Sequence, residues 1–302
     1  MRERKIKTLT KKSLKIFIES ELFALVTNVK ANYDENMAAR ENNPFLPIKE
    51  KNIKKNMAIG RSVDSQLGNR MQRIIFYMAR MKYGDVAVPN IVTINKTDGD
   101  SVEICTYSVP IYTEENDRKK DFNPFSQVIY IGQSFSINQV KEKLKLKKKS
   151  EALIEKRYTL PDVSENAMKY IEKPKRKTVP VDLLYFGIQS ENLVKAETFE
   201  IKLGGKLDTK NSGGNADEVE ELTNIFSCLK ENEAFFGTCY GECSQPVAKK
   251  IEKLNRASVL NNKDLWEKVI PTNIAGFTYD QFIDMYQKAF KKSKLETTIK
   301  CL

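Results

Sequence analysis

Two short runs of residues carry side chains whose types and spacing suit chemistry. Residues 181–186 contain Asp182, and residues 197–202 contain Glu200 and Lys202. Both runs are apolar or aromatic and bounded by proline or glycine, which is typical of β-strands. Because side chains alternate along a strand, Glu200 and Lys202 share one face. If Asp182 occupies the matching place on the first strand, two carboxylates and one ammonium group converge.

Such a group of side chains suits the hydrolysis of phosphodiester bonds. Asp182 and Glu200 offer the oxygen ligands that Mg²⁺ prefers, and a bound metal ion lowers the pKa of its water so that the water can attack at neutral pH. Lys202 is placed to stabilise the hydroxide or the charge that develops on the phosphate oxygens. The alternative is a surface ion pair between Glu200 and Lys202, because acid-x-Lys is common in a chain with 30% charged residues.

At these residues the sequence resembles the PD-(D/E)XK nucleases. Asp182 matches the first acid of that motif, Glu200 the second acid and Lys202 the lysine. The Pro-Asp pair of the family is displaced by one residue here, as Pro180-Val181-Asp182. The resemblance implies an α/β fold with a restriction-endonuclease-like central mixed sheet flanked by helices, and Mg²⁺-dependent cleavage of DNA.

The run that follows Lys202 extends the resemblance. Residues 200–211, Glu-Ile-Lys-Leu-Gly-Gly-Lys-Leu-Asp-Thr-Lys-Asn, look like the TdeIII-like group of type II restriction endonucleases. Membership would imply sequence-specific cutting of double-stranded DNA, and palindromic recognition implies a homodimer in which each site cuts one strand. It would also imply a cognate DNA methyltransferase encoded nearby that protects host DNA.

Several further residues are expected to support the site. We expect Lys206 and Lys210 to contact DNA phosphates, and Asp208 to lie behind the metal ligands. In type II restriction endonucleases a helix ahead of the core often supplies a glutamate. In this sequence the corresponding helix, expected at 62–81, offers only Asp64 and the amide of Gln66. An amide binds a metal ion more weakly than a carboxylate does. An equally weighted alternative is that this helix serves close packing alone.

The composition of the chain excludes several classes of catalytic and metal-binding site. The chain has 302 residues, a formal net charge of +11 and no histidine. The lack of histidine excludes His-dependent nucleases, Ser-His-Asp triads and His-ligated zinc. The five cysteines lack paired CxxC spacing, so neither a disulfide framework nor a zinc site is expected. No run approaches the length of a membrane span and the N-terminus does not resemble a signal peptide, so we expect a cytoplasmic protein without membrane contact.

A basic segment precedes Asp182. It contains Lys173, Lys175, Arg176 and Lys177. DNA binding is dominated by neutralisation of phosphates, and an acidic metal site would otherwise repel its substrate, so we predict that these side chains contact DNA. A solvated linker would have a similar composition.

The hydrophobic periodicity predicts the elements that must position these residues. Strands are expected at 91–94, 102–107, 127–131 and 234–240, and helices at 8–29, 62–81, 136–149 and from Asn215 onward. Ser62 or Asp64 is expected to cap the second helix, and the chain from 247 to 302 is expected to be helical. We therefore divide the chain into residues 1–178, a helical region with a β insertion that contributes to DNA recognition, residues 179–245, the catalytic core, and residues 246–302, a helical end. The alternative is that all three form one compact domain.

Two other functions remain open. A nuclease of the same fold could act in repair and cut by DNA structure or without specificity. A basic DNA-binding protein without catalysis would bind DNA and leave it intact.

Overall fold

The structure is a computed structural model that describes most of the chain. None of the helices it describes combines the length and apolar character needed to span a membrane. The described residues are 10–41, 49–111, 125–146, 152–205, 212–274 and 276–302.

The described residues form two compact units. The larger contains Ile75–Pro271, and the smaller combines Thr10–Ile74 with Thr272–Leu302. The division therefore runs across the three segments expected from the sequence, because the smaller unit joins helices from both ends of the chain. Mixed sheets flanked by helices confirm the expected α/β class, although the strands form two sheets and not a single central one.

Five strands of the larger unit form its first mixed sheet. They are β1 (Ile91–Lys96), β2 (Val102–Ser108), β3 (Gln127–Ile131), β4 (Ile154–Leu160) and β5 (Thr178–Val181). Their order is β4-β2-β1-β3-β5, with β1 and β3 parallel and the other neighbours antiparallel. The expected strands at 91–94, 102–107 and 127–131 are confirmed, including the hairpin between the first two.

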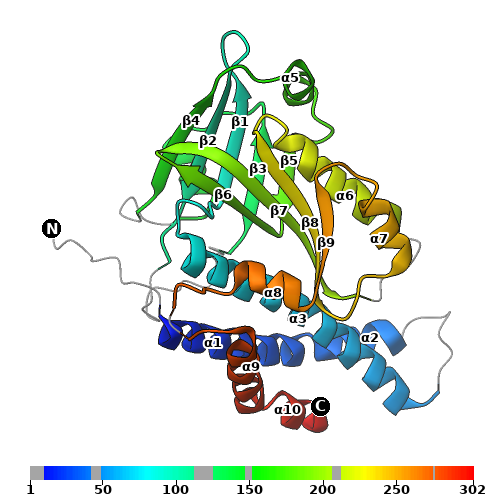
Figure 1. The fold of residues 1–302 in the computed structure, drawn as a ribbon. Helices are drawn as coiled ribbons and strands as arrows, with labels where there is room; N and C mark the ends of the chain where they lie inside the picture. Colours follow the sequence, from blue (N-terminus) through cyan, green and yellow to red (C-terminus); the bar gives the residue numbers. More distant parts are fainter. Residues whose placement is uncertain (1–9, 42–48, 112–124, 147–151, 206–211, 275) are drawn as a thin grey trace. The chain divides into compact units, whose positions relative to one another are not determined.

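Four strands form the second mixed sheet. They are β6 (Leu183–Gln189), β7 (Asn192–Gly204), β8 (Glu231–Tyr240) and β9 (Ala257–Asn261). β6 and β7 form an antiparallel hairpin, whereas β7, β8 and β9 run parallel. Parallel neighbours need a crossover, and helices α6 (Ser212–Ile225) and α7 (Gln245–Ile251) supply it after β7 and β8 respectively (Figure 1).

Helices cover both faces of this second sheet. Phe236 lies on the face that packs against α6, in one core cluster with Val219. Gly237, the next residue of β8, meets Leu265 of α8 (Lys263–Val269), so closely that an added Cβ would lie 2.8 Å from the leucine Cδ1. The strands that carry the candidate site are therefore held between α6 and α8 (Figure 1).

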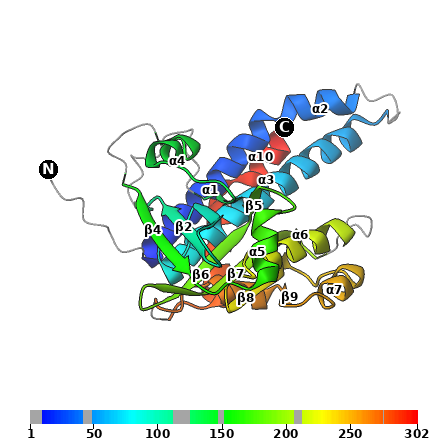
Figure 2. The same ribbon diagram turned by 90° about the horizontal axis from the view of Figure 1, so that it is seen from above.

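The remaining helices of the larger unit lie along the first sheet. They are α4 (Ile137–Lys143) and α5 (Glu165–Glu172). α5 packs against both β1 and α6, and Figure 2 shows it beside α6. It thereby brings the basic segment that follows it close to α6.

The smaller unit is helical. α1 packs against α9, and the buried carboxylate of Glu21 forms 3.0 Å ion pairs with Arg70 and Arg73 of α3. The Thr278 side chain caps α9 by accepting a hydrogen bond from the N–H of Gln281, as the spacing of these two residues predicts. The helices of this unit are α1 (Lys11–Ala31), α2 (Tyr33–Glu41), the first part of α3 (Lys51–Tyr83), α9 (Tyr279–Ser293) and α10 (Leu295–Cys301).

Several expected helix boundaries were wrong. α3 begins at Lys51, so Ser62 and Asp64 lie inside it and cap nothing. The lysine-rich stretch before Ser62 consists largely of good helix formers, which extends the helix backward. α6 likewise begins at Ser212, ahead of the expected cap Asn215.

Two other expectations also need correction. α4 ends at Lys143, because Leu144 already forms its C-cap. The region 247–302 is not entirely helical, since β9 lies within it and pairs with β8. β9 is only five residues long and half-buried throughout, so it lacks the alternation that identifies a strand in sequence.

Asp182 lies where the chain leaves one sheet and enters the other. Val181 pairs with Gln127 in the first sheet, and Leu183 pairs with Phe199 in the second. The buried side chain of Gln127 bridges this junction: its Nε2 donates to the carbonyl of Leu184 at 2.9 Å, and its Oε1 accepts from the N–H of Leu184 at 2.8 Å. Gln127 thus fixes the backbone next to Asp182.

Replacing Gln127 tests this junction. Gln127→Leu leaves buried backbone groups of Leu184 without partners, so we expect the free energy of unfolding to fall by about 2–4 kcal/mol, since each such group costs about 1–3 kcal/mol. Gln133→Leu is the matched control, because Gln133 donates to an exposed carbonyl and its loss should change stability by less than about 0.5 kcal/mol. Equal denaturation midpoints for the two variants would contradict the bridging role of Gln127.

Candidate active site

The structure brings Asp182, Glu200 and Lys202 together. Leu183 pairs with Phe199, and the antiparallel register continued by one residue sets Asp182 opposite Glu200. The carboxylate of Asp182 is oriented by the backbone, because its Oδ2 accepts a hydrogen bond from the N–H of Ile201 at 2.7 Å. The two carboxylates therefore converge where β6 begins beside β7.

Lys202 completes the group. Its Nζ lies 2.5 Å from Oε1 of Glu200, and both side chains are partly accessible, at 32% and 16% exposure. Phe199 and Ile201 are buried on the opposite face of β7, so the predicted alternation along this strand is confirmed.

A cavity of about 220 Å³ opens at these carboxylates. Glu218 of α6 and Arg176 also line it, so a third carboxylate and a second cation border the same space. The lining residues are Arg176, Val179, Pro180, Val181, Asp182, Glu200, Glu218 and Leu222.

Asp182 and Glu200 resist ionisation. Burial raises the pKa of Asp182, and the charge of Glu218 adds to that effect, while the hydrogen bond from Ile201 and the charge of Lys202 oppose it. Burial and the charge of Asp182 likewise raise the pKa of Glu200. For Lys202 burial works to lower the pKa, but Glu200 and the neighbouring acids outweigh it, so the pKa is raised and the ammonium form is retained. Carboxylates held in this way gain from a cation.

The residues fit a partly hydrated Mg²⁺. Within the described parts of the chain, no group of three or more aspartate, glutamate or cysteine side chains is arranged to enclose a metal ion. Mg²⁺, however, usually binds through one or two carboxylates and keeps waters or takes phosphate oxygens as its other ligands. Asp182 and Glu200 supply that number, and burial, with the mutual proximity of acidic groups, raises the pKa of both, so a cation would favour their ionised forms.

The other sequence-predicted residues have different positions. Lys206, Asp208 and Lys210 lie outside the described residues. Asp64 and Gln66 belong to the smaller unit, where Asp64 is exposed and the amide of Gln66 accepts a hydrogen bond from Asn28. Gln66 thus has a role in helix packing, in agreement with the alternative given for this helix.

The glycines after Lys202 serve chain packing. A Cβ added to Gly205 would lie 1.9 Å from the carbonyl oxygen of Glu242. The same stretch is tied by hydrogen bonds from the N–H of Gly205 to the carbonyl of Tyr240 and from the N–H of Ser244 to the carbonyl of Gly205. The end of β7 is thereby fixed to the end of β8.

The basic segment lies beside the cavity. Lys173, Lys175 and Lys177 are exposed, and the backbone carbonyl of Lys177 accepts from Ile131. Arg176 differs from these lysines because it forms an ion pair with Glu221 of α6 and also lines the cavity.

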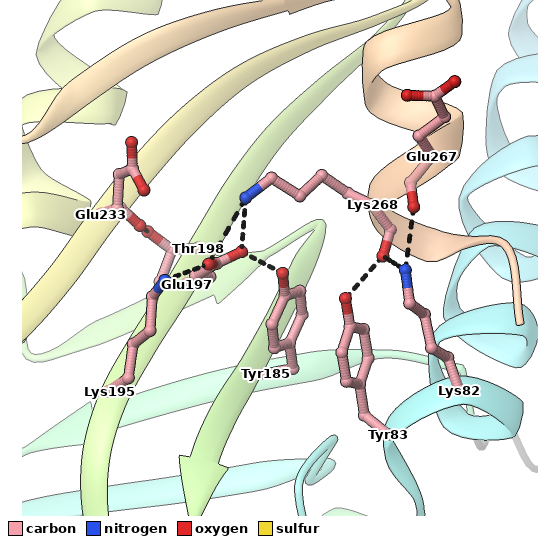
Figure 3. A network of polar contacts seen from close by, with 9 residues as sticks. All are labelled: Lys82, Tyr83, Tyr185, Lys195, Glu197, Thr198, Glu233, Glu267 and Lys268. Carbon is pink, nitrogen blue, oxygen red and sulfur yellow. Dashed lines mark hydrogen bonds and ion pairs between the residues drawn. The ribbon is translucent and has the colours of Figure 1, made fainter. Parts of the chain in front are cut away.

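A second polar network lies on the opposite face of β7 (Figure 3). Glu197 is 4% exposed and accepts from Tyr185, while Lys195 and Lys268 approach its carboxylate to 2.6 and 3.2 Å. Burial works to raise the pKa of Glu197, but these donors together lower it. Tyr83 stacks on Tyr185 with ring centroids 4.0 Å apart. Glu197 is therefore a fully compensated carboxylate, and the network joins β7 to α8.

Sequence reasoning missed three acidic residues of this region. Glu218, Glu221 and Glu197 were not assigned to the site. A signal existed for the first two, since Glu218 and Glu221 lie one helical turn apart in α6, next to the apolar stripe that contains Leu222. No local pattern separates Glu197 from an ordinary strand residue.

A comparison of the sequence with models of known protein families gives no match, and neither does a comparison with functionally curated proteins. The functional argument therefore depends on the geometry of the site.

The raised pKa of Asp182 predicts how stability depends on pH. A carboxyl group whose pKa is higher in the folded state contributes its full stability below the unfolded pKa and loses it as the pH rises through the folded pKa. In metal-free protein, Asp182→Asn should therefore raise the unfolding free energy at about pH 8 by ~1–3 kcal/mol, and by less at about pH 5.

Thermal unfolding in the presence of a chelator measures this effect. Glu231→Gln is the matched control, because Glu231 is exposed at the opposite end of the neighbouring strand and should show no such gain. A metal-free Asp182→Asn protein that is no more stable than wild type at the higher pH would contradict the assignment of Asp182 as an uncompensated carboxylate.

Proposed function

We propose that the protein is a Mg²⁺-dependent endonuclease of the PD-(D/E)XK type that hydrolyses phosphodiester bonds of double-stranded DNA, and specifically a type II restriction endonuclease. One observation carries this proposal: Asp182, which directly precedes β6, and Glu200 of the adjacent β7 line one open cavity, and Lys202 pairs with Glu200 there. The order strand, strand, helix, strand over β6, β7, α6 and β8 supports it, since the resemblance found in the sequence implies that order.

The residues at the cavity would have different roles in catalysis. Asp182 and Glu200 would hold Mg²⁺, which when bound supplies a water of lowered pKa and charge stabilisation for the phosphate oxygens. The N–H of Ile201 donates a hydrogen bond to Oδ2 of Asp182 and so fixes this oxygen. The fixed oxygen in turn sets the orientation of the whole carboxylate group, including Oδ1. Lys202, paired with Glu200 as an ammonium ion, donates hydrogen bonds to the attacking water or to a phosphate oxygen and stabilises charge that develops there.

The surrounding charges suit a polyanionic substrate. An acidic cavity repels DNA unless cations border it, and Lys173, Lys175 and Lys177 are exposed on the segment that leads into Asp182. These lysines would contact the DNA backbone, with Lys206 and Lys210 as further phosphate contacts. They position the duplex without reading its sequence.

Recognition of a specific site would need a second copy of the chain. The run that begins at Glu200 resembles the TdeIII-like group, and an enzyme that cuts both strands of a palindrome acts as a two-fold symmetric homodimer. A cognate DNA methyltransferase encoded nearby would protect host DNA. The protein would then act in the cytoplasm, where both partners meet DNA.

Cleavage of unmethylated phage DNA in the presence of Mg²⁺ tests this function. We expect discrete fragments whose ends share one sequence. Asp182→Asn, Glu200→Gln and Lys202→Met should each lower the rate by about 10²-fold or more, because the first two remove a ligand charge for the metal ion and the third removes the cation that stabilises charge on the reacting phosphate.

Glu231→Gln and Lys230→Met are matched controls, since both residues are exposed at the opposite end of β8 and should leave the rate unchanged. A smear of fragments that is lost in the three site variants would replace restriction by structure-specific or non-specific nuclease activity. Intact DNA that is nevertheless bound would refute catalysis and favour a DNA-binding protein.

A further inference from the structure

Arg176 is held at the active-site cavity by a buried carboxylate. Its Nε donates to Oε2 of Glu221 at 2.7 Å, and its Nη2 donates to the same oxygen. The Glu221 side chain is 2% exposed, whereas the Arg176 side chain is 43% exposed. One partner of the ion pair is therefore anchored inside α6, and the other reaches the surface.

The cluster around this pair is not fully satisfied. In the described part of the chain, Oε1 of Glu221 and the hydroxyl of the neighbouring Tyr170 are buried without a hydrogen-bond partner. Burial first, and then the charge of Glu221, raise the pKa of Tyr170 to about 12, so its hydroxyl keeps its proton. Buried polar atoms without partners are rare in native proteins and often mark functional sites.

The ion pair is poorly explained by stability alone. Burying a charged pair contributes little net stability, because desolvation offsets the attraction, and a hydrophobic pair in the same place is often as stable or more stable. The unpaired Oε1 of Glu221 adds a further cost. Functional residues frequently occupy such costly arrangements.

Arg176 retains the capacity to bind another anion. A guanidinium group carries five N–H donors, and the contacts with Glu221 use Nε and Nη2, so Nη1 and the second N–H of Nη2 are not taken up by any hydrogen bond to the described residues. Arg176 lines the same cavity as Asp182 and Glu200. Its planar group matches the geometry of a phosphate better than an ammonium group does.

We propose that Arg176 binds a phosphate group of the DNA strand that enters the carboxylate cavity, and that Glu221 is the positioning residue that fixes its guanidinium there. This inference rests on the proposed nuclease function and adds to it a specific phosphate contact. Asp182, Glu200 and Glu218 give the cavity three acidic side chains, and Arg176 supplies a cation at its wall, whereas Lys202 pairs with Glu200. The substrate phosphate is then held between the metal-binding carboxylates and the guanidinium.

Substitution of Arg176 tests the phosphate contact. Arg176→Met should lower kcat by about 10²-fold, as expected for removal of one charged donor from the reacting group. It should also reduce the slope of log affinity against log salt concentration by about one, because one phosphate contact is lost. Arg176→Lys should restore the salt slope but only part of kcat, since it keeps the charge and loses the planar geometry.

Arg157→Met is the matched control. Arg157 also pairs with glutamates of the same unit, but it lies on β4 with a 62% exposed side chain. Its replacement should leave both kcat and the salt slope unchanged. Affinity is measured with Ca²⁺ in place of Mg²⁺, so that binding is observed without turnover.

A double-mutant cycle tests the positioning role of Glu221. Glu221→Gln keeps the side-chain size and should lower kcat by about 10-fold with a small change in KM, because the guanidinium loses its fixed orientation. If Glu221 acts through Arg176, the double variant Glu221→Gln, Arg176→Met is no slower than Arg176→Met alone. A purely structural role for Glu221 predicts that the two losses in kcat multiply.

The outcomes separate this inference from the proposed function. If wild type cleaves DNA and Arg176→Met matches it in kcat and salt slope, the phosphate contact is refuted and the nuclease function stands. If wild type binds DNA without cleaving it and the salt slope still falls in Arg176→Met, the nuclease function is refuted and the phosphate contact stands. Multiplying losses in the cycle would overturn the role of Glu221.

Discussion

The candidate site depends on one chain segment that crosses from the first sheet to the second at Asp182. β5 is an edge strand, which accommodates Pro180 because a proline has no N–H to contribute to a ladder. One residue after Val181 the chain begins β6 and pairs with β7. Asp182 is left between the two ladders, where its side chain accepts a hydrogen bond from β7. The carboxylate of Asp182 is thereby fixed opposite Glu200. In an uninterrupted strand, the same residue would lie within a sheet and not at the junction of two.

On the two faces of β7, the pKa of a buried carboxylate is shifted in opposite directions. Glu197 receives a tyrosine hydroxyl and two lysines, and its pKa is lowered. Glu200 has one lysine but faces a second acid, and its pKa is raised. The first arrangement stabilises the attachment of β7 to α8, and the second stores unfavourable charge that a divalent cation would relieve. The fold thus supplies a rigid support on one face and the proposed cation site on the other.

The proximity of Glu200 and Lys202 and many of the strands could be predicted from the sequence, for physical reasons. Alternation along 197–202 and the bounding glycines specify a strand and its faces, so Glu200 and Lys202 could be placed together from local information. The break after Val181 could not, because it depends on Gln127, a residue far away in the chain that bridges both sheets. Glu221 was missed for the same reason: its burial and its contact with Arg176 arise only when α5 and α6 pack together. Short half-buried elements such as β9 carry no periodic signal.

Binding of a divalent cation in the absence of DNA tests the central claim most directly. The account predicts that Mg²⁺, and also Ca²⁺, raises the thermal unfolding midpoint of wild-type protein in a concentration-dependent way, because a ligand that binds only the folded state stabilises it. The double variant Asp182→Asn, Glu200→Gln should show no such rise. Glu197→Gln should show the same rise as wild type, measured from the unfolding midpoint of that variant without the cation. An equal rise in wild type and in the double variant would contradict the assignment of Asp182 and Glu200 as the cation site.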